Sequence, residues 1–161
     1  CAKWAKEEGI PTVLDIDKVE PLTPRLIQLI DFVITSSRFP ALYTGLSDPK
    51  KALLKIQEQI SGFLCATWGS EGAMALVDGE IFHVGAPLVK VVDTTGAGDV
   101  FHAGFIYGLL QNWELGDILR FANWSAGLKC REMGGRKGIP SLKEVQKFRR
   151  GIDRRRDLKV S

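Results

Sequence analysis

One segment, residues 93–99 with the sequence DTTGAGD, constrains the fold and the chemistry of this chain more than any other. It lies between the β-branched run 88–92 and the apolar segment 100–110, so we expect a strand, a glycine-bearing loop and then a helix. The first N–H groups of such a helix have no partner within the helix. Together with the positive end of the helix dipole they form a seat for an anion such as a phosphate.

The residue types in this segment fit that interpretation. Gly96 and Gly98 can adopt positive φ and allow a ligand to approach the backbone closely. Asp99 would repel an anion unless it had its own task, and the task we assign to it is to accept a proton. The alternative is a simple strand-to-helix turn whose Asp and Thr side chains only cap the helix.

The segment matches neither of the two common phosphate-binding motifs. It lacks the Gly-Lys-Ser/Thr ending of a P-loop and the third glycine of the dinucleotide fingerprint. Together with residues 100–105 (VFHAGF), it resembles the signature of the ribokinase-like sugar kinases, the PfkB family. The resemblance extends from residue 12 to the last helix and implies a three-layer α/β/α fold with a mostly parallel sheet. It also implies ATP-dependent phosphorylation of a sugar hydroxyl.

Site roles follow from this resemblance, residue by residue. Asp99 would be the catalytic base, and the amides of Gly96, Ala97 and Gly98 would form the anion hole for the transferring phosphoryl group. Asp93 and Thr95 resemble positions that hold a monovalent cation such as K⁺ in some members. Mg²⁺ would accompany ATP, because fixed donors and Mg²⁺ stabilise most of the charge in phosphoryl transfer.

Two further regions resemble nucleotide contacts of the family. The segment 67–72 (TWGSEG) looks like its Thr-x-Gly-x-x-Gly element, which would make Thr67, Gly69 and Gly72 nucleotide-binding, although a tight turn between strands explains it about as well. Asn123 and Gly135 resemble the wall of the adenine pocket, while a surface polar residue is the alternative for Asn123.

The sequence departs from the family at one position that concerns the metal. The usual Asn-x-x-Glu element, which organises the Mg²⁺ water shell, is replaced by Ser36 and Phe39. Ser36 could orient a metal-bound water, or Ser36 or Ser37 could cap the following helix, whereas Phe39 supplies no carboxylate. The protein contacts of the metal therefore stay open.

Composition narrows the classes of function. A chain of 161 residues, 45% hydrophobic, can form one domain, which we expect to span 1–161. The net charge of +3 is too small to indicate a nucleic-acid partner, although basic residues cluster between 149 and 159. Three widely spaced cysteines favour reduced thiols and a cytoplasmic location over zinc or disulfides, and no segment is typical of a membrane span.

Alternating patterns predict an open and largely parallel α/β sheet covered on both faces. Asp78-Gly79 is a favoured hairpin turn, Ser141 and Glu144 form a capping box, and the pair Gly104 and Gly108 indicates close helix packing.

The chain opens as the back end of a helix, so we expect the second half of a longer family member. Predicted strands are 12–17, 31–34, 63–67, 73–77, 80–84 and 88–92; predicted helices are 25–30, one ending at Gly45, 49–60, one from Asp99, and 114–131.

The sugar cannot be identified, because the sugar contacts of this family come largely from the half of the fold that this chain lacks. We expect the 161 residues alone to be inactive, with a homodimer of the full-length protein left open. A kinase for a nucleoside or another small alcohol is one alternative. The others are a non-catalytic nucleotide-binding module and nucleic-acid binding through the basic tail.

Overall fold

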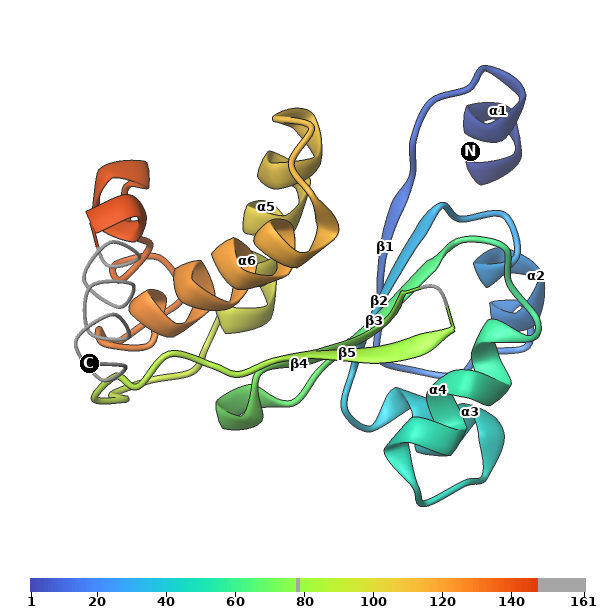
Figure 1. Cartoon of the computed structure of the whole chain (residues 1–161), viewed down its shortest axis with the longest axis horizontal. Helices are drawn as coiled ribbons and strands as arrows, with labels where there is room; N and C mark the ends of the chain where they lie inside the picture. Colours follow the sequence, from blue (N-terminus) through green and yellow to red (C-terminus); the bar gives the residue numbers. More distant parts are fainter. Residues whose placement is uncertain (78, 148–161) are drawn as a thin grey trace, which may run out of the picture. The chain divides into compact units, whose positions relative to one another are not determined.

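The structure is a computed structural model that describes residues 1–77 and 79–147. It forms two compact units, Cys1–Val84 and a second that starts at Gly85 (Figure 1). The basic cluster between 149 and 159 lies outside the described residues.

The first unit is built on a five-stranded mixed sheet whose spatial order follows the sequence. The first three strands are parallel, and the last two form the predicted antiparallel hairpin, with Val77 opposite Glu80. The predicted α/β class is therefore confirmed, with two antiparallel pairs beside the two parallel ones. The strands are β1 (Val13–Ile16), β2 (Phe32–Ser36), β3 (Phe63–Thr67), β4 (Ala73–Val77) and β5 (Glu80–Val84).

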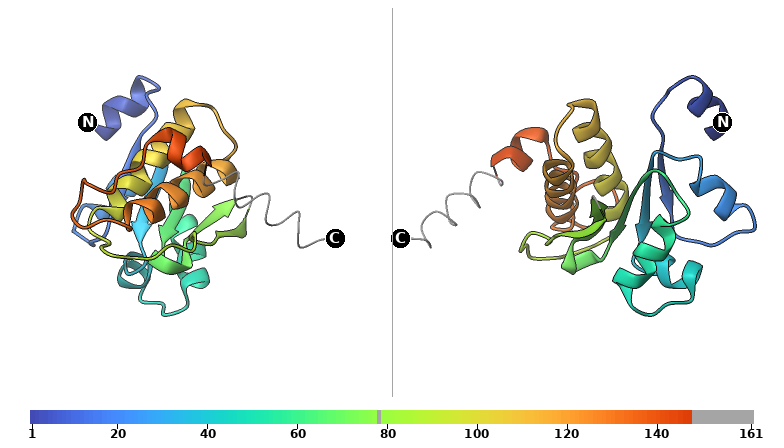
Figure 2. Two further views of the ribbon diagram at one scale, coloured as in Figure 1. Left: turned by 90° about the vertical axis from the view of Figure 1, so that its left-hand side faces the viewer. Right: turned by 45° about the vertical axis from the view of Figure 1, so that its right-hand side comes forward.

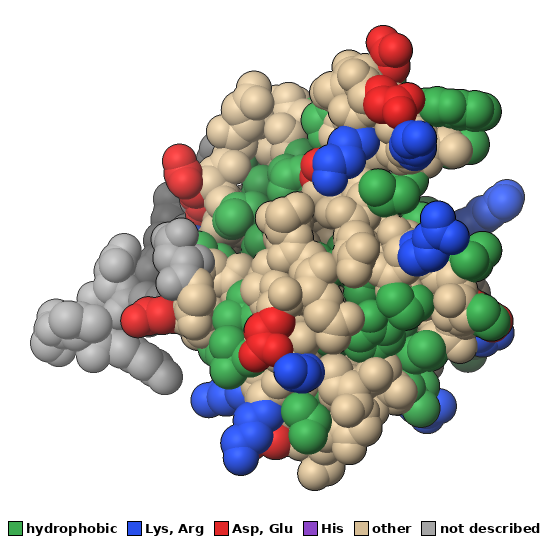
Figure 3. Space-filling model, turned by 90° about the vertical axis from the view of Figure 1, so that its right-hand side faces the viewer, with side chains coloured by type: hydrophobic (Ala, Val, Ile, Leu, Met, Phe, Trp, Pro, Cys, Tyr) green, Lys and Arg blue, Asp and Glu red, His purple; other side chains and the backbone are tan. Residues whose placement is uncertain are grey.

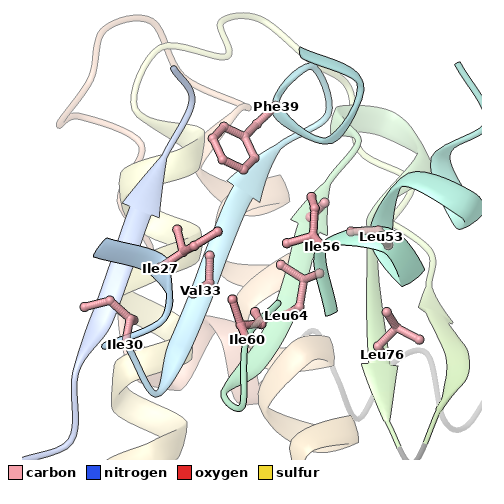
Figure 4. Close-up of a cluster of buried hydrophobic side chains, with 10 residues drawn as sticks. Ile27, Ile30, Val33, Phe39, Leu53, Ile56, Ile60, Leu64 and Leu76 are labelled. Atoms are coloured by element: carbon pink, nitrogen blue, oxygen red, sulfur yellow. The ribbon is translucent and has the colours of Figure 1, made fainter. Parts of the chain in front are cut away.

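Three helices bury one face of this sheet. Ile27 of α2, Phe39 of α3 and Ile56 of α4 pack with the strand residues Val33 and Leu64 in one fully buried cluster (Figure 4). Burial of each such side chain contributes about 1.5–3 kcal/mol, so this cluster holds the unit together. The helices of the unit are α1 (Ala2–Glu7), α2 (Thr23–Ile27), α3 (Phe39–Thr44), α4 (Pro49–Gln57) and the 3₁₀ turn η1 (Gly69–Glu71).

Local signals set most of the helix ends. Asp48 caps α4 by accepting from the N–H groups of Lys50 and Lys51, and Gly45 ends α3 with φ of 74°. The prediction that Ser36 or Ser37 caps α3 is wrong. The helix starts later, with Arg38 at its N-cap and no side-chain cap, because β2 continues through Ser36 before the chain turns.

The second unit contains two long helices, α5 (Ala97–Leu110) and α6 (Leu115–Lys129), which pack against each other (Figure 2). A Cβ on Gly104 would lie 3.0 Å from the Cα of Ala122, and one on Gly108 would lie 2.8 Å from Cγ1 of Ile118. Close packing, the predicted reason for this glycine pair, is confirmed.

Aromatic side chains extend this helix contact. Tyr107 of α5 stacks on Phe121 of α6 with 5.5 Å between ring centroids, and Trp113 meets Phe121 edge-on at 5.2 Å. Trp124 is buried in the same cluster. These rings contribute directly to the core of the second unit.

The segment 88–92 was predicted to be a strand, and this is wrong. It has no strand conformation, and Leu88 is fully exposed while Val91 and Val92 are about half exposed. A strand needs a neighbouring strand for its ladder, and the backbone here makes a different contact: the N–H groups of Val92 and Asp93 both donate to the carbonyl of Cys130. Hydrophobic pattern alone did not reveal that no ladder partner is adjacent.

The predicted capping box is confirmed. Ser141 donates its N–H and hydroxyl to Glu144 Oε2, and its hydroxyl oxygen accepts from the N–H of Glu144. The helix that follows starts at Leu142 and is described as far as Lys147.

On the face drawn in Figure 3, lysine and arginine side chains are interspersed with acidic and apolar ones. Among the described residues, no helix is both long enough and apolar enough to cross a bilayer. Cys1 is exposed, and Cys65 and Cys130 are buried and free.

Candidate active site

The start of α5 carries the candidate site. Gly96 is the N-cap and takes φ of 78°, a left-handed conformation that lets the chain turn sharply into the helix. Asp99 follows in the first turn of α5 and is exposed. The prediction that a glycine-bearing loop leads directly into a helix is therefore confirmed, with Gly96 as the last residue before α5.

The backbone donors at this helix start are partly engaged and partly open. The N–H of Ala97 donates to the carbonyl of Thr94 at 3.0 Å, so this amide is occupied by the turn itself. Within the described part of the chain, the N–H groups of Gly96, Gly98 and Asp99 have no protein acceptor. A cluster of open donors at a helix N-terminus can bind an anion.

Asp93 organises the loop that precedes the helix. Its Oδ1 accepts from both the N–H and the hydroxyl of Thr95, at 2.9 and 2.8 Å, and its Oδ2 accepts from the N–H of Gly134 at 2.6 Å. The bonds from Thr95, then that from Gly134, and the nearby charge of Lys129 lower the pKa of this carboxyl to about 2. The carboxylate thus ties the signature loop to the loop after α6.

Lys129 was not identified from the sequence. It is the last residue of α6, its side chain is fully buried, and its Nζ donates to the carbonyl oxygen of Asp93 at 3.0 Å. Lysine is rarely fully buried, and at a helix end it usually just complements the helix dipole. No local signal in the sequence distinguishes this residue from such a surface lysine.

The structure brings Gly135, in the loop after α6, against the signature loop, and its place in an adenine pocket stays a prediction. A Cβ built on Gly96 would lie 2.9 Å from the carbonyl oxygen of Gly135, and a Cβ built on Gly135 would lie 3.7 Å from Cγ2 of Thr95. Asn123 is 5% exposed, so the alternative that it is a surface polar residue is wrong. Its place in the adenine pocket stays a prediction.

In the first unit, the segment 67–72 forms the tight turn between β3 and β4. Gly69 and Gly72 both take positive φ, and the N–H of Trp68 donates to the carbonyl of Gly72 across the turn. Thr67 donates its hydroxyl to the carbonyl of Thr35. Turn geometry therefore accounts for both glycines, and contact with a nucleotide is an additional role that stays a prediction.

Ser36 and Phe39 occupy different environments. Ser36 ends β2 beside Thr67 in the parallel register, at the carboxyl edge where ligands bind in such sheets. Phe39 is fully buried and stacks on Tyr43 with 5.5 Å between centroids. Position 39 is therefore part of the hydrophobic core, and a metal-binding carboxylate has no place there in this chain.

His102 takes part in its own helix. Its Nδ1 lies 2.8 Å from the carbonyl oxygen of Gly98, one turn earlier. This contact supports a packing role over the alternative of a metal site or relay with Asp99. In the described ranges, 1–77 and 79–147, no group of three or more His, Cys, Asp or Glu residues is arranged to hold a metal ion.

Comparison with known proteins settles the family. The family model described as pfkB family carbohydrate kinase matches residues 1–142. The chain belongs to the pfkB family of carbohydrate kinases. The matched range includes residues 93–99, and the ribokinase-like fold expected from that segment is confirmed by the solved structures that this pfkB chain resembles.

Three relatives illustrate the match. The ribokinase of Lactococcus lactis subsp. lactis is 33% identical over 147 residues, which cover 90% of this chain and 47% of that protein. The ketohexokinase of Mus musculus is 34% identical over 123 residues, 73% of this chain and 41% of that protein. The structure of Arabidopsis thaliana ribokinase complexed with ribose and ATP has a TM-score of 0.82 at 28% identity, covering 91% of this chain and 49% of that one. The chain spans about half the length of the relatives it matches.

Proposed function

We propose that this chain forms the phosphoryl-transfer half of an ATP-dependent kinase that phosphorylates a hydroxyl of a sugar. The observation that carries the proposal is the start of α5, where Gly98 and Asp99 offer backbone donors with no acceptor among the described residues beside an exposed carboxylate. Membership of the pfkB family and similarity to a ribokinase that binds ribose and ATP support it.

In the proposed mechanism, the donors at the helix start hold the transferring phosphoryl group, with Gly96 and Gly98 contributing amides and Ala97 contributing once its bond to Thr94 is released. Asp99 accepts the proton of the sugar hydroxyl as that oxygen attacks phosphorus. A carboxylate is a sufficient base because little proton transfer is needed before the bond to the leaving oxygen has stretched. Thr67, Gly69, Gly72, Asn123 and Gly135 would contact the nucleotide.

Mg²⁺ would enter with the nucleotide rather than at a preformed protein cage. The ion keeps several waters and commonly binds through substrate phosphates, and Phe39 leaves no carboxylate at the position where the family usually has one. The residues present therefore fit a metal carried by ATP. When bound, it would neutralise charge on the phosphates.

The decisive experiment separates binding from chemistry. Calorimetric titration of the chain with Mg-ATP should give binding that Asp99→Asn leaves nearly unchanged, because the mutation removes the base but not the amide donors. In the full-length protein the same substitution should lower phosphoryl transfer to the preferred sugar by about 10²–10⁴-fold. Near-normal turnover of Asp99→Asn would refute the assignment of the base.

The substrate and the alternatives are tested in the same series. A panel of pentoses, ketohexoses and nucleosides separates a sugar kinase from a nucleoside kinase by relative kcat/KM. The absence of Mg-ATP binding would favour a non-catalytic module, which the replacement of the Asn-x-x-Glu element by Ser36 and Phe39 motivates. A cytoplasmic location and a homodimer of the full-length protein are further parts of the proposal.

A further inference from the structure

The ammonium group of Lys129 is buried, so hydrogen bonds and an opposite charge must offset the hydration that it loses. The side chain is fully buried, and its Nζ donates to the carbonyl oxygen of Asp93 at 3.0 Å. Removing a charged group from water is unfavourable unless hydrogen bonds and an opposite charge offset the lost hydration. The opposite charge near it is the carboxylate of Asp93, whose pKa the lysine helps to lower.

The oxygens of Asp93 are already committed to groups of the protein. A carboxylate offers about four lone-pair sites, and three of them accept from Thr95 N–H, Thr95 Oγ1–H and Gly134 N–H. The main-chain carbonyl of the same residue accepts from the ammonium. Asp93 is thus enclosed by four donors, one of them charged.

A monovalent cation at Asp93 and Thr95 does not fit this arrangement. Such an ion binds through free oxygen lone pairs, whereas three of the roughly four lone-pair sites on the Asp93 carboxylate already accept hydrogen bonds. The ion would also stand close to the ammonium of Lys129, in a partly buried region where like charges repel strongly. Both the charge of Lys129 and the occupied oxygens of Asp93 therefore argue against the monovalent-cation site expected from the sequence.

We propose that Lys129 is a built-in cation: its ammonium supplies at the signature loop the positive charge that a bound alkali ion would otherwise supply. The shape of residues 93–98 and the affinity for nucleotide then do not depend on K⁺ or Na⁺. Lys129 is a positioning residue that acts through Asp93. The statement on nucleotide affinity rests on the proposed function, whereas the statement on the loop does not.

The first test uses the unmodified chain. Its melting temperature and its affinity for Mg-ATP are measured in KCl, NaCl and tetramethylammonium chloride at one ionic strength of about 0.1 M. We expect both quantities to agree among the three salts. A rise of more than about 5 °C, or an affinity gain of more than about threefold, in K⁺ or Na⁺ over tetramethylammonium would overturn the proposal.

The second test removes the charge. Lys129→Met keeps most of the volume and should lower the melting temperature by about 5 °C or more and weaken Mg-ATP binding by about tenfold or more. Lys129→Ala leaves a space that propylammonium or K⁺ can enter, so either should restore part of both losses. Lys137→Met is the matched control, because that lysine is 77% exposed and 3.7 Å from Glu132.

The outcomes separate this proposal from the proposed function. If the unmodified chain binds no Mg-ATP in any salt, the kinase proposal fails, and the melting temperatures still decide the role of Lys129. If Lys129→Met melts and binds like the Lys137→Met control, the built-in cation is refuted. If Lys129→Met does not fold, the salt comparison on the unmodified chain decides between the built-in cation and a bound alkali ion.

Discussion

The carbonyl oxygen of Gly135 lies 2.9 Å from the position that a Cβ on Gly96 would occupy. Gly96 also takes φ of 78°, so the loop before α5 is fixed both by its backbone conformation and by the chain packed against it. Only glycine meets both conditions.

We therefore predict that Gly96→Ala destabilises the second unit by about 1–3 kcal/mol and weakens Mg-ATP binding, because the loop must move away from Gly135. Urea denaturation measures the first effect and calorimetry the second. Gly98→Ala is the control for stability, since a Cβ there meets nothing within 4 Å. Equal stability of the two variants would contradict the assigned role of Gly96.

A second prediction concerns the contact between α5 and α6. Gly108→Ala places a methyl group 2.8 Å from Cγ1 of Ile118, which is 1% exposed, so overpacking should cost about 1–3 kcal/mol. The cost should shrink when Ile118 is also changed to Ala, because the methyl group then has space. A double-mutant cycle on the free energy of unfolding measures this coupling, and an additive result would exclude the direct contact.

A third prediction concerns pH and the pair Thr12 and Asp31, which connects the start of β1 to the start of β2. The hydroxyl and then the N–H of Thr12, each 2.8 Å from Asp31 Oδ2, lower the pKa of that carboxyl. The stabilising contribution is therefore present above the pKa of the unfolded chain, about 3.9, and is lost as the pH falls through the lower pKa of the folded state.

Thr12→Val should lower the melting temperature at neutral pH and reduce its decline below about pH 4. Thr12→Ser keeps the hydroxyl and should behave like the unmodified protein. A Thr12→Val variant with the same acid dependence as Thr12→Ser would show that the bonds to Asp31 contribute nothing.

A fourth prediction addresses the missing metal-site carboxylate. Phe39→Glu restores the residue type usual in the family, but it places a charge in a fully buried position and should destabilise the first unit by about 3–5 kcal/mol or more. Phe39→Leu keeps the position apolar and should cost less. A stable Phe39→Glu variant with tighter Mg-ATP binding would show that this position faces the metal.

Most of the correct predictions concern features formed by residues that are close together in the sequence. The glycine at position 96, the hairpin between Val77 and Glu80, and the capping box at Ser141 each depend on groups a few residues apart. Such features form from short-range backbone preferences and hydrogen bonds. These features could therefore be predicted without knowledge of the fold.

The wrong prediction of a strand at residues 88–92 has a different cause. Residues 88–92 have the composition of a strand, but a strand exists only beside a partner, and the chain contacts Cys130 there instead. At position 39 the sequence indicates only a departure from the pattern expected for the family, whereas the structure shows that Phe39 is buried and stacked on Tyr43. Composition reports what a segment prefers, not which neighbours it meets.

By itself, the sequence determined the family, the turn into α5 and the residue type of the candidate base, because these lie within one short and specific signature. The tertiary structure alone decided that Lys129, 36 residues from Asp93 along the chain, places its ammonium at that residue's carbonyl. The physical reason is that the cost or benefit of a buried charge depends on which groups surround it in space. Those neighbours are set by how α6 packs, which no local pattern encodes.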